Sequence, residues 1–494
     1  MSANLTGICA CCCVAIVFAL GACSDSRPTV YFANLGFEEA CADEPTGLCA
    51  WDVSYRVRSD IAIRDDDRVG RVLAIDNADG VGFVEQEARF NNPPEESILT
   101  FSALIRTEDV AGRGAGLNIG IYDADSALIQ NVDMGYGGFS SATGTTDWRP
   151  YRISAVVTSD ARRVRIGLIN YGTGLAMFDS AAVAWEPLRG RRPSGFARDY
   201  VDVAIEHIRQ NSLQRDSVDV ASIRLKALQI AGEASAAEKA YPAIRYMLGA
   251  LGDRHSFLMT ARERALWQQD TGGRDITFSS ARRIEQFGYV SVPGFHSDDA
   301  RLKVAFADSL QRQLHRLYRE GVRGWVVDLR ENDGGNMAPM LAGLEPLFTA
   351  DTLGFLIDVD GGREAWGRGE AIREAEGDDY VVTSETARFE RRLPIAVLYG
   401  GRTGSSGEIV IISFIGDPAV RSFGVPSMGL TTGNGEFELP DGSYMYMAST
   451  RMADRTGAVF QGPVVPDSVV GADAEAIDAA LDAALAWLRE SSSP

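Results

Sequence analysis

Lysine and histidine are scarce in this chain of 494 residues. Its only lysines are Lys226, Lys239 and Lys303, and it contains four histidines. Because no lysine follows Lys303, a lysine base is excluded from the C-terminal part of the sequence. The four imidazoles remain as side chains whose ordinary pKa suits a general base near pH 7.

Positive charge is also in deficit. The chain has 48 Lys and Arg residues against 68 Asp and Glu residues, a formal net charge of −20 with a pI near 4.7. Such a surface repels the phosphates of nucleic acids and of anionic membranes. The apolar fraction of 45% is ordinary for globular proteins, and the length allows two or three domains. We therefore expect a multidomain globular protein with no nucleic-acid partner.

The hydrophobic run at residues 11–23, CCCVAIVFALGAC, is too short to span a membrane comfortably and is typical of a secretory signal peptide. Its end, LGAC, resembles the bacterial lipobox. That resemblance implies a lipoprotein signal peptide over 1–23, a lipid anchor on Cys23, and a cell-envelope protein. Ser24 then indicates sorting to the outer membrane, facing the periplasm. Residues 1–8 lack the usual Lys or Arg, so a cytosolic protein is the alternative.

Five of the seven cysteines lie in the first 23 residues. The other two, Cys41 and Cys49, flank the turn ADEPTGL, and an exported compartment would permit a disulfide bond between them. The alternative is two free thiols. A zinc site has no support, because no His or second Cys pair lies nearby. We expect no metal.

Residues 30–187 read as β-structure throughout. Runs with period-two alternation, separated by Gly, Asp, Asn and Thr turns, predict an all-β sandwich. The clearest runs are LTFSALIRT (99–107), LNIGIYD (117–123), YRISAVV (151–157), VRIGLIN (164–170) and AMFDSAAVAW (176–185).

This layout resembles the galactose-binding-like jelly-roll family. The resemblance is carried by FANLGFEE (32–39), TFSALIRTED (100–109), GTTDWRPYRI (144–153) and GLAMFDSAAV (174–183). It implies a domain that binds carbohydrate or acts as a structural spacer. Trp51, Tyr136 and Trp148 would form a stacking platform for a sugar, or else pack into the fold.

The remainder of the chain changes character. A basic linker with Pro and Gly at 188–197 leads into a helical subdomain at 198–260. From 284 to 490, strands and amphipathic helices alternate, which predicts an α/β domain. The fold class is thus multidomain, with an all-β region, a helical subdomain and an α/β domain.

A strand, tight turn and helix at 395–416 place a serine where it can act as a nucleophile. The turn GGRTGSSGE contains Ser405 and Ser406 just before the apolar run IVIISFIG. Glycines allow the sharp turn that projects a side chain from the sheet edge. The alternative is that Ser405 only caps the helix.

Two further segments would have to converge on this serine. In DLRENDGG (328–335), a buried strand ends in a Gly-rich loop whose free N–H groups could face an oxyanion. By itself, this segment could equally be an ordinary strand-to-helix turn. In DRHSFL (253–258), His255 follows a predicted helix end.

Together, TGSSGE (403–408), VDLRENDGG and LGDRHSFL resemble the C-terminal-processing (tail-specific) serine peptidase family, in its histidine-bearing, tricorn-like branch. The segments VPSMGLTTG (425–433) and GPVVPD (462–467) match later signatures of the family. The resemblance spans about 198–490 in the correct order. It implies a crotonase-like α/β fold, hydrolysis of protein or peptide substrates through an acyl-enzyme, and no cofactor. A PDZ insertion is not expected, because only about 28 residues separate DRHSFL from FGYVSV.

The resemblance assigns roles residue by residue. Ser405 is the nucleophile, and the amide of Ser406 with that of Gly334 or Gly335 forms the oxyanion hole. Many members have a lysine base where this chain has Leu430, so the base is instead His255. The other histidines, His207, His296 and His315, are interpreted as packed or solvated.

The group that orients His255 stays open. In the tricorn-like branch a serine precedes the histidine, where this chain has Arg254, and a glutamate falls near Val465. The possible substitutes are Ser256, Asp467 and Asp253, whereas Glu408 is interpreted as structural. These departures leave room for an alternative: a weak or inactive family member that binds peptide, lipid or glycan. Hydrolysis of esters is a third possibility.

Overall fold

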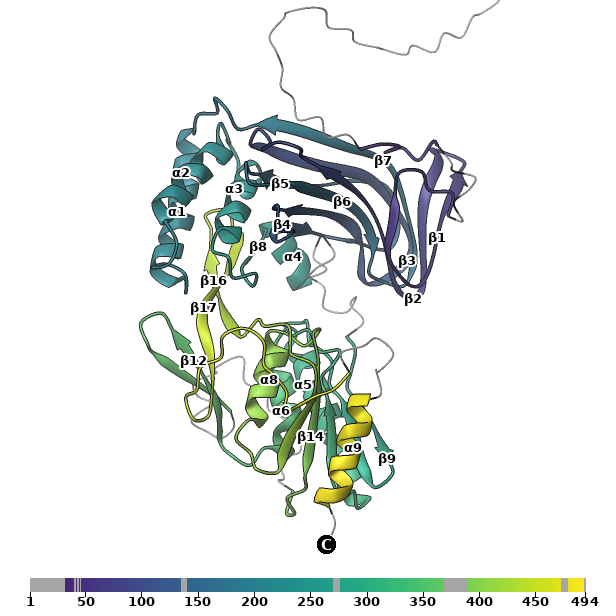
Figure 1. Cartoon of the computed structure of the whole chain (residues 1–494), viewed down its shortest axis with the longest axis vertical. Helices are drawn as coiled ribbons and strands as arrows, with labels where there is room; N and C mark the ends of the chain where they lie inside the picture. Colours follow the sequence, from purple (N-terminus) through teal and green to yellow (C-terminus); the bar gives the residue numbers. More distant parts are fainter. Residues whose placement is uncertain are drawn as a thin grey trace, which may run out of the picture.

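The computed structural model describes residues 32–39, 41, 44, 46–134, 140–269, 276–367, 389–471 and 479–492. Cys23 and Tyr136 lie outside the described residues. Figure 1 shows a large β-region at the top, three helices beside it and an α/β region below. The multidomain organisation and the sheet-rich N-terminal region are confirmed. The jelly-roll and crotonase-like assignments and the domain boundaries stay predictions.

The N-terminal region is one antiparallel sheet of seven strands that surrounds its own core. The first part of β3 pairs with β5 and β7, and its last part pairs with β6 and β4. Because one long strand serves two sets of neighbours, the sheet bends over itself and buries its alternate side chains. The strands are β1 (Asp52–Asp66), β2 (Gly70–Arg89), β3 (Ser97–Tyr122), β4 (Leu128–Asp133), β5 (Ala142–Val157), β6 (Arg163–Asn170) and β7 (Gly174–Pro187).

Cys41 and Cys49 lie next to this sheet, and their sulfur atoms are 2.11 Å apart, which is a disulfide distance. The predicted small loop is therefore present. As for membrane segments, none of the described helices is long and apolar enough to span a bilayer.

Three helices join the β-region to the rest of the chain. They are α1 (Gly195–Asn211), α2 (Val220–Ala231) and α3 (Ala237–Gly249). Their core includes Ile98 and Val156 from the β-region, and Met445 and Met447 from the far side. A shared apolar core of this kind holds the three parts together as one body.

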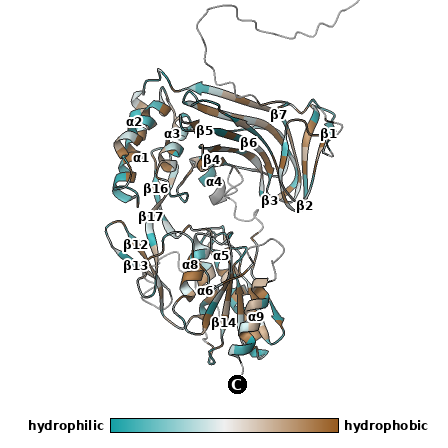
Figure 2. Cartoon of the chain, in the orientation of Figure 1, coloured by the Kyte–Doolittle hydropathy of each residue, from teal (hydrophilic) through white to brown (hydrophobic). Residues whose placement is uncertain are grey.

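The α/β region is built on a six-stranded sheet in the order β18-β15-β14-β11-β10-β9. All its neighbours are parallel except β9 and β10. Both faces are covered, so strands such as β11 and β14 are buried along their whole length. Figure 2 shows that β14 is mostly hydrophobic. The strands are β9 (Ser280–Ile284), β10 (Phe287–Ser291), β11 (Trp325–Asp328), β14 (Ile395–Tyr399), β15 (Val420–Gly424) and β18 (Ser468–Val469).

Helices cover the two faces of this sheet. One core packs the sheet against α5, α6 and α8, and a second packs its other face against α9. The buried face of α5 carries apolar side chains at helical spacing, among them Leu310, Leu314 and Leu317. The helices are α5 (Ala300–Arg319), α6 (Met337–Leu344), α8 (Ser406–Phe414) and α9 (Ala479–Ser491).

A second, antiparallel sheet has the order β13-β12-β17-β16, and β8 also pairs with β17. Through this sheet the residues after His255 are held beside β17, whose other neighbour β16 begins at Thr432. The sheet thereby brings two distant segments to the N-terminus of α8. Its strands are β8 (Phe257–Met259), β12 (Thr352–Asp358), β13 (Arg363–Gly367), β16 (Thr432–Glu438) and β17 (Tyr444–Asp454), and α4 (Ala261–Gln269) follows β8.

Candidate active site

Ser405 lies at the sharp turn between β14 and α8, in a backbone conformation that few non-glycine residues adopt. Its φ is 53° and its ψ is −122°. Such a conformation costs about 1–3 kcal/mol and persists only where the surroundings enforce it. Here the backbone N–H of Ser405 donates to Oε2 of Glu408 at 2.9 Å. This strand–turn–helix geometry presents a serine hydroxyl at the edge of a sheet, as a nucleophile elbow does.

His255 faces that hydroxyl. Nε2 of His255 lies 3.0 Å from Oγ of Ser405, although 150 residues separate the two in sequence. The other ring nitrogen, Nδ1, lies 2.7 Å from Oγ1 of Thr432. If Oγ1 of Thr432 accepts a hydrogen bond from Nδ1–H, then Nε2 has the lone pair that can accept the proton of Ser405.

The backbone of His255 is fixed separately from its ring. Oδ1 of Asp253 accepts from the N–H groups of His255 and Ser256 at 2.9 and 2.8 Å. The hydroxyl of Ser256 donates to Oδ2 of Asp253 at 2.7 Å, and Asn434 donates to the carbonyl of His255 at 2.9 Å. Asp253 and Ser256 therefore shape the turn that carries the histidine, and the hydrogen bond to its ring comes from Thr432.

The structure places Asp467 elsewhere. Its carboxylate is exposed and accepts from the N–H and hydroxyl of Ser422 on β15, both at 2.8 Å. Val465 is 64% exposed, while Leu430 is buried at the position of the family lysine. The sequence reasoning missed Thr432, which lies two residues after Leu430 in VPSMGLTTG. The family motifs indicate a carboxylate or a serine in this role, and a threonine at the start of a strand has no distinguishing pattern in the sequence.

Burial lowers the pKa of the His255 imidazole from 6.5 to about 4, and the nearby carboxylate of Asp253 opposes this shift. The ring is therefore neutral at pH 7. A neutral ring is the form that can accept a proton from Ser405.

The loop ENDGG (331–335), hereafter the oxyanion loop, lies directly against the serine turn. A Cβ on Gly334 would lie 2.9 Å from Cβ of Ser405 and 3.2 Å from the backbone nitrogen of Ser406. Both Gly334 and Gly335 have positive φ, 106° and 96°. Only glycine combines that conformation with so close an approach.

The amides of this loop differ in their partners. The N–H of Gly334 donates to Oδ1 of Asn332 at 3.1 Å. Across the described ranges, the N–H groups of Gly335 and Ser406 have no such acceptor. The carbonyl of Gly335 accepts from the Ser406 hydroxyl at 2.5 Å, so the two residues are in direct contact. Of the two glycines considered, Gly335 is the one with an available donor.

Glu408 is fully buried behind the serine turn. Besides the Ser405 amide, its carboxylate accepts from the Ser427 hydroxyl at 2.5 Å and the Gly429 N–H at 2.8 Å. Burial raises the pKa of this carboxyl, and these hydrogen bonds oppose the rise. Glu408 thus ties the turn to the segment that leads to Thr432, consistent with the structural role expected for it.

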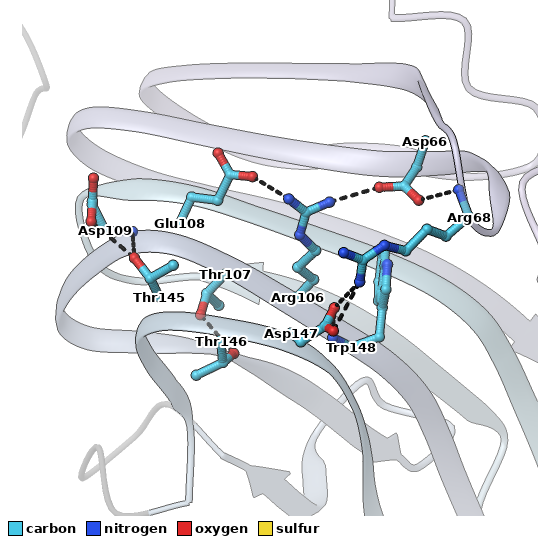
Figure 3. Close-up of polar contacts among 10 residues, drawn as sticks. All are labelled: Asp66, Arg68, Arg106, Thr107, Glu108, Asp109, Thr145, Thr146, Asp147 and Trp148. Atoms are coloured by element: carbon cyan, nitrogen blue, oxygen red, sulfur yellow. Dashed lines mark hydrogen bonds and ion pairs between the residues drawn. The ribbon is translucent and has the colours of Figure 1, made fainter.

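The two described tryptophans considered as part of a sugar platform pack into different apolar clusters of the β-region. Trp51 is 5% exposed, and its Nε1 donates to the Asn34 carbonyl at 3.1 Å. Trp148 is half-buried and packs against a small apolar cluster that contains Val72 and Met177. Figure 3 shows Trp148 beside Arg68 among ion pairs of the sheet. With Tyr136 outside the described residues, both described tryptophans fit the packing alternative.

The remaining histidines lie in different settings. Nε2 of His207 is 3.1 Å from the Glu438 carbonyl, and the buried ring of His315 packs edge-on against Phe389. His296 contacts the oxyanion loop, with Nε2 2.9 Å from Oδ1 of Asp333. Within the described ranges, no three His, Cys, Asp or Glu residues are grouped so as to hold a metal ion.

Comparison with known proteins identifies the α/β region. Residues 286–470 match the model of peptidase family S41. The resemblance to C-terminal-processing peptidases that the motifs indicated is therefore confirmed for this segment.

Individual proteins are similar to parts of this chain in sequence or in structure. The nisin-resistance protein of Lactococcus lactis subsp. lactis is 28% identical over 275 residues, 54% of this chain and 81% of that protein. The chloroplastic carboxyl-terminal-processing peptidase 2 of Arabidopsis thaliana is 23% identical over 172 residues, 35% of this chain and 29% of that protein. Among solved structures, a lipoprotein from Streptococcus agalactiae has a TM-score of 0.49 at 23% identity, covering 60% of this chain and 96% of its own.

The electrostatics predict how His255 titrates. Because burial disfavours the imidazolium, the ring should gain its proton only as the pH falls through about 4. An NMR titration of the histidine ring signals measures this, and the His255→Gln variant identifies the signal to follow. A midpoint at 6.5 or above would contradict the buried, neutral ring.

Proposed function

With residues 286–470 forming a domain of peptidase family S41, we propose that this chain is an exported serine peptidase. It hydrolyses peptide bonds of proteins or peptides through an acyl-enzyme at Ser405. The observation that carries the proposal is the contact of 3.0 Å between Oγ of Ser405 and Nε2 of His255. A strained serine facing a neutral imidazole at a helix N-terminus is the arrangement that nucleophilic catalysis requires.

Acylation begins when Oγ of Ser405 attacks the carbonyl carbon of the scissile bond. His255 takes the hydroxyl proton on Nε2, so the attacking oxygen gains the character of an alkoxide. The hydroxyl of Thr432 at 2.7 Å accepts from Nδ1–H and keeps the ring in the required tautomer. When the tetrahedral intermediate collapses, the imidazolium gives its proton to the leaving amine, and the acyl group remains on Ser405.

Deacylation repeats these steps with water as the nucleophile. His255 removes a proton from water, the hydroxide attacks the ester carbon, and the proton returns to Oγ of Ser405. In both halves, negative charge develops on the former carbonyl oxygen. The N–H groups of Ser406 and Gly335 stabilise it, because neither has another acceptor in the described chain and both lie at the serine turn.

The orienting group in this scheme is a neutral hydroxyl. A carboxylate would also stabilise the imidazolium that forms during the reaction, whereas Thr432 can only hold the ring in place. This fits the low pKa of His255, whose charged form has little compensation. We infer that His255 is in its proton-accepting form at pH 7, and that the imidazolium formed in the transition state is only modestly stabilised by its surroundings.

Export and anchoring belong to the same proposal. The run at 11–23 and LGAC at its end support a lipid anchor on Cys23 in the cell envelope, with the peptidase facing the periplasm. The disulfide-distance pair Cys41 and Cys49 fits an oxidising compartment.

A fluorophosphonate probe tests the nucleophile and the base. Ser405→Ala should abolish labelling, and His255→Ala should slow it by about 10²- to 10⁴-fold, the usual contribution of a general base. His207→Ala is the matched control and should label at the wild-type rate. Labelling of His255→Ala at the wild-type rate would contradict the proposed base.

The same experiment separates the rival functions. Exported wild-type protein that never labels would favour a protein that keeps the fold but only binds its ligand. Protein that labels and cleaves model esters, yet leaves peptides intact, would favour an esterase.

Thr432→Val tests the orienting hydroxyl. The change keeps the side-chain volume and removes one neutral hydrogen bond worth about 1 kcal/mol, so the labelling rate should fall about fivefold. Thr432→Ser should restore most of the rate. Equal rates in Thr432→Val and the wild type, at equal thermal stability, would show that the ring is oriented by something else.

Cys23→Ser tests the anchor in a bacterial host. Loss of the lipid should move the protein from the membrane fraction to the soluble fraction. Cys13→Ser, in the same hydrophobic run, should leave the distribution unchanged. A Cys23→Ser protein that stays with the membranes would contradict the lipid anchor.

A further inference from the structure

The β-region touches the oxyanion loop through one arginine. Arg113, on β3, forms an ion pair with Oδ2 of Asp333. Asp333 is the residue directly before Gly334, which packs on Ser405. A side chain from the N-terminal β-region is therefore only one residue away from the backbone that lines the candidate active site.

Arg113 reaches the loop because β3 is irregular at this point. The pairing of β3 with β5 shifts register between Val110 and Ala115. Gly112 and Gly114, on either side of Arg113, have φ values of 76° and 78°. The Ser141 hydroxyl donates to the Arg113 carbonyl at 2.6 Å and fixes the bulge. Bulges of this kind redirect a side chain away from the regular sheet.

The carboxylate of Asp333, which pairs with Arg113, is held in place by further contacts within the α/β region. Oδ1 of Asp333 lies 2.9 Å from Nε2 of His296. The carboxylate therefore contacts His296 through one oxygen and Arg113 through the other. A Cβ on Gly294 would lie 2.5 Å from that same Oδ1, so a larger residue there would displace the carboxylate. Nδ1 of His296 would in turn be 3.0 Å from a Cβ on Gly335. Asp333, Gly335 and the imidazole of His296 thus form one packed unit, and Arg113 attaches it to the β-region.

We propose that Arg113 is a positioning residue for the reaction, and that the β-region acts in catalysis by holding the oxyanion loop in place. The inference rests on the proposed function, since it assigns a role to that same site. Arg113 touches no reacting atom. Through Asp333 it fixes where Gly334 and Gly335 lie relative to Ser405, and so where the oxyanion donors point.

The ion pair between Arg113 and Asp333 is partly exposed to solvent. The exposure limits how much the pair can change the reaction rate and makes that contribution sensitive to salt. The Arg113 side chain is 41% exposed and that of Asp333 is 23% exposed. Exposed pairs contribute little to overall stability and are screened by salt. We therefore expect a change in the loop and in the rate rather than unfolding.

Arg113→Ala should slow fluorophosphonate labelling about two- to fivefold at low ionic strength, the range expected for one exposed ion pair. In the wild type, the labelling rate should fall towards that of the variant as salt rises from roughly 0.02 to 0.5 M, whereas the variant should show no such fall. Arg113→Lys, which keeps the charge, should recover most of the rate. Arg113→Ala combined with Asp333→Asn should be no slower than Asp333→Asn alone.

Hydrogen exchange provides a readout that does not need activity. In Arg113→Ala, the amides of Gly334 and Asn336, which donate to Asn332 and to the Phe295 carbonyl, should exchange faster than in the wild type. Arg68→Ala is the matched control. It breaks the exposed pair of Arg68 with Asp147 within the β-region and should change neither exchange nor labelling (Figure 3).

The two proposals fail in different ways. If the wild type never labels, the peptidase proposal falls, and the exchange comparison still decides whether Arg113 holds the loop. If Arg113→Ala exchanges, labels and responds to salt as the wild type does, the positioning role is overturned while the peptidase proposal stands.

Discussion

The candidate site is organised around the contact of 3.0 Å between Nε2 of His255 and Oγ of Ser405. It joins residues that come from different sheets. Ser405 lies in the turn between β14 and α8. The buried carboxylate of Glu408 stabilises its strained conformation by accepting a hydrogen bond from the Ser405 backbone N–H. His255 is carried by a turn built on Asp253 and aligned by the pairing of β8 with β17. The contact therefore requires both the turn that carries Ser405 and the turn that carries His255.

Thr432 adds a third segment to this contact. The strand β16 begins at Thr432 and pairs with β17, so the sheet that aligns His255 also delivers the hydroxyl that holds its ring. The proposed mechanism therefore requires neither the lysine of many relatives nor a carboxylate on the ring. Burial keeps the imidazole neutral, and a neutral partner suffices to select its tautomer. In the proposed mechanism, the imidazole of His255 is in its neutral, proton-accepting form at any ordinary pH. Its protonated form is stabilised less than it would be by a carboxylate.

The β-region and the helices are part of the same mechanical unit. The helical core includes side chains from the β-region and from β17, so one apolar core connects the β-region to the hairpin β16–β17. At the site itself, the bulge around Arg113 reaches the oxyanion loop next to Gly334. An N-terminal domain that resembled a spacer or a sugar-binding module thus has a physical connection to the backbone that faces Ser405.

The strand-rich N-terminal region and the α/β character of the C-terminal region could be predicted from the sequence alone, and the pair Ser405 and His255 from motifs that resemble those of C-terminal-processing peptidases. These follow from local signals: alternation with period two, apolar stripes with helical period, glycines at a tight turn, and motifs in a fixed order. The partner of the ring could not be found in that way. Asp253, Ser256 and Asp467 were reasonable because they are near in sequence or in motif, yet Thr432 makes the contact. This contact, and the one between Arg113 and Asp333, depend on the pairing of distant strands and on a bulge in β3. Neither feature has a signature within a few residues of either partner.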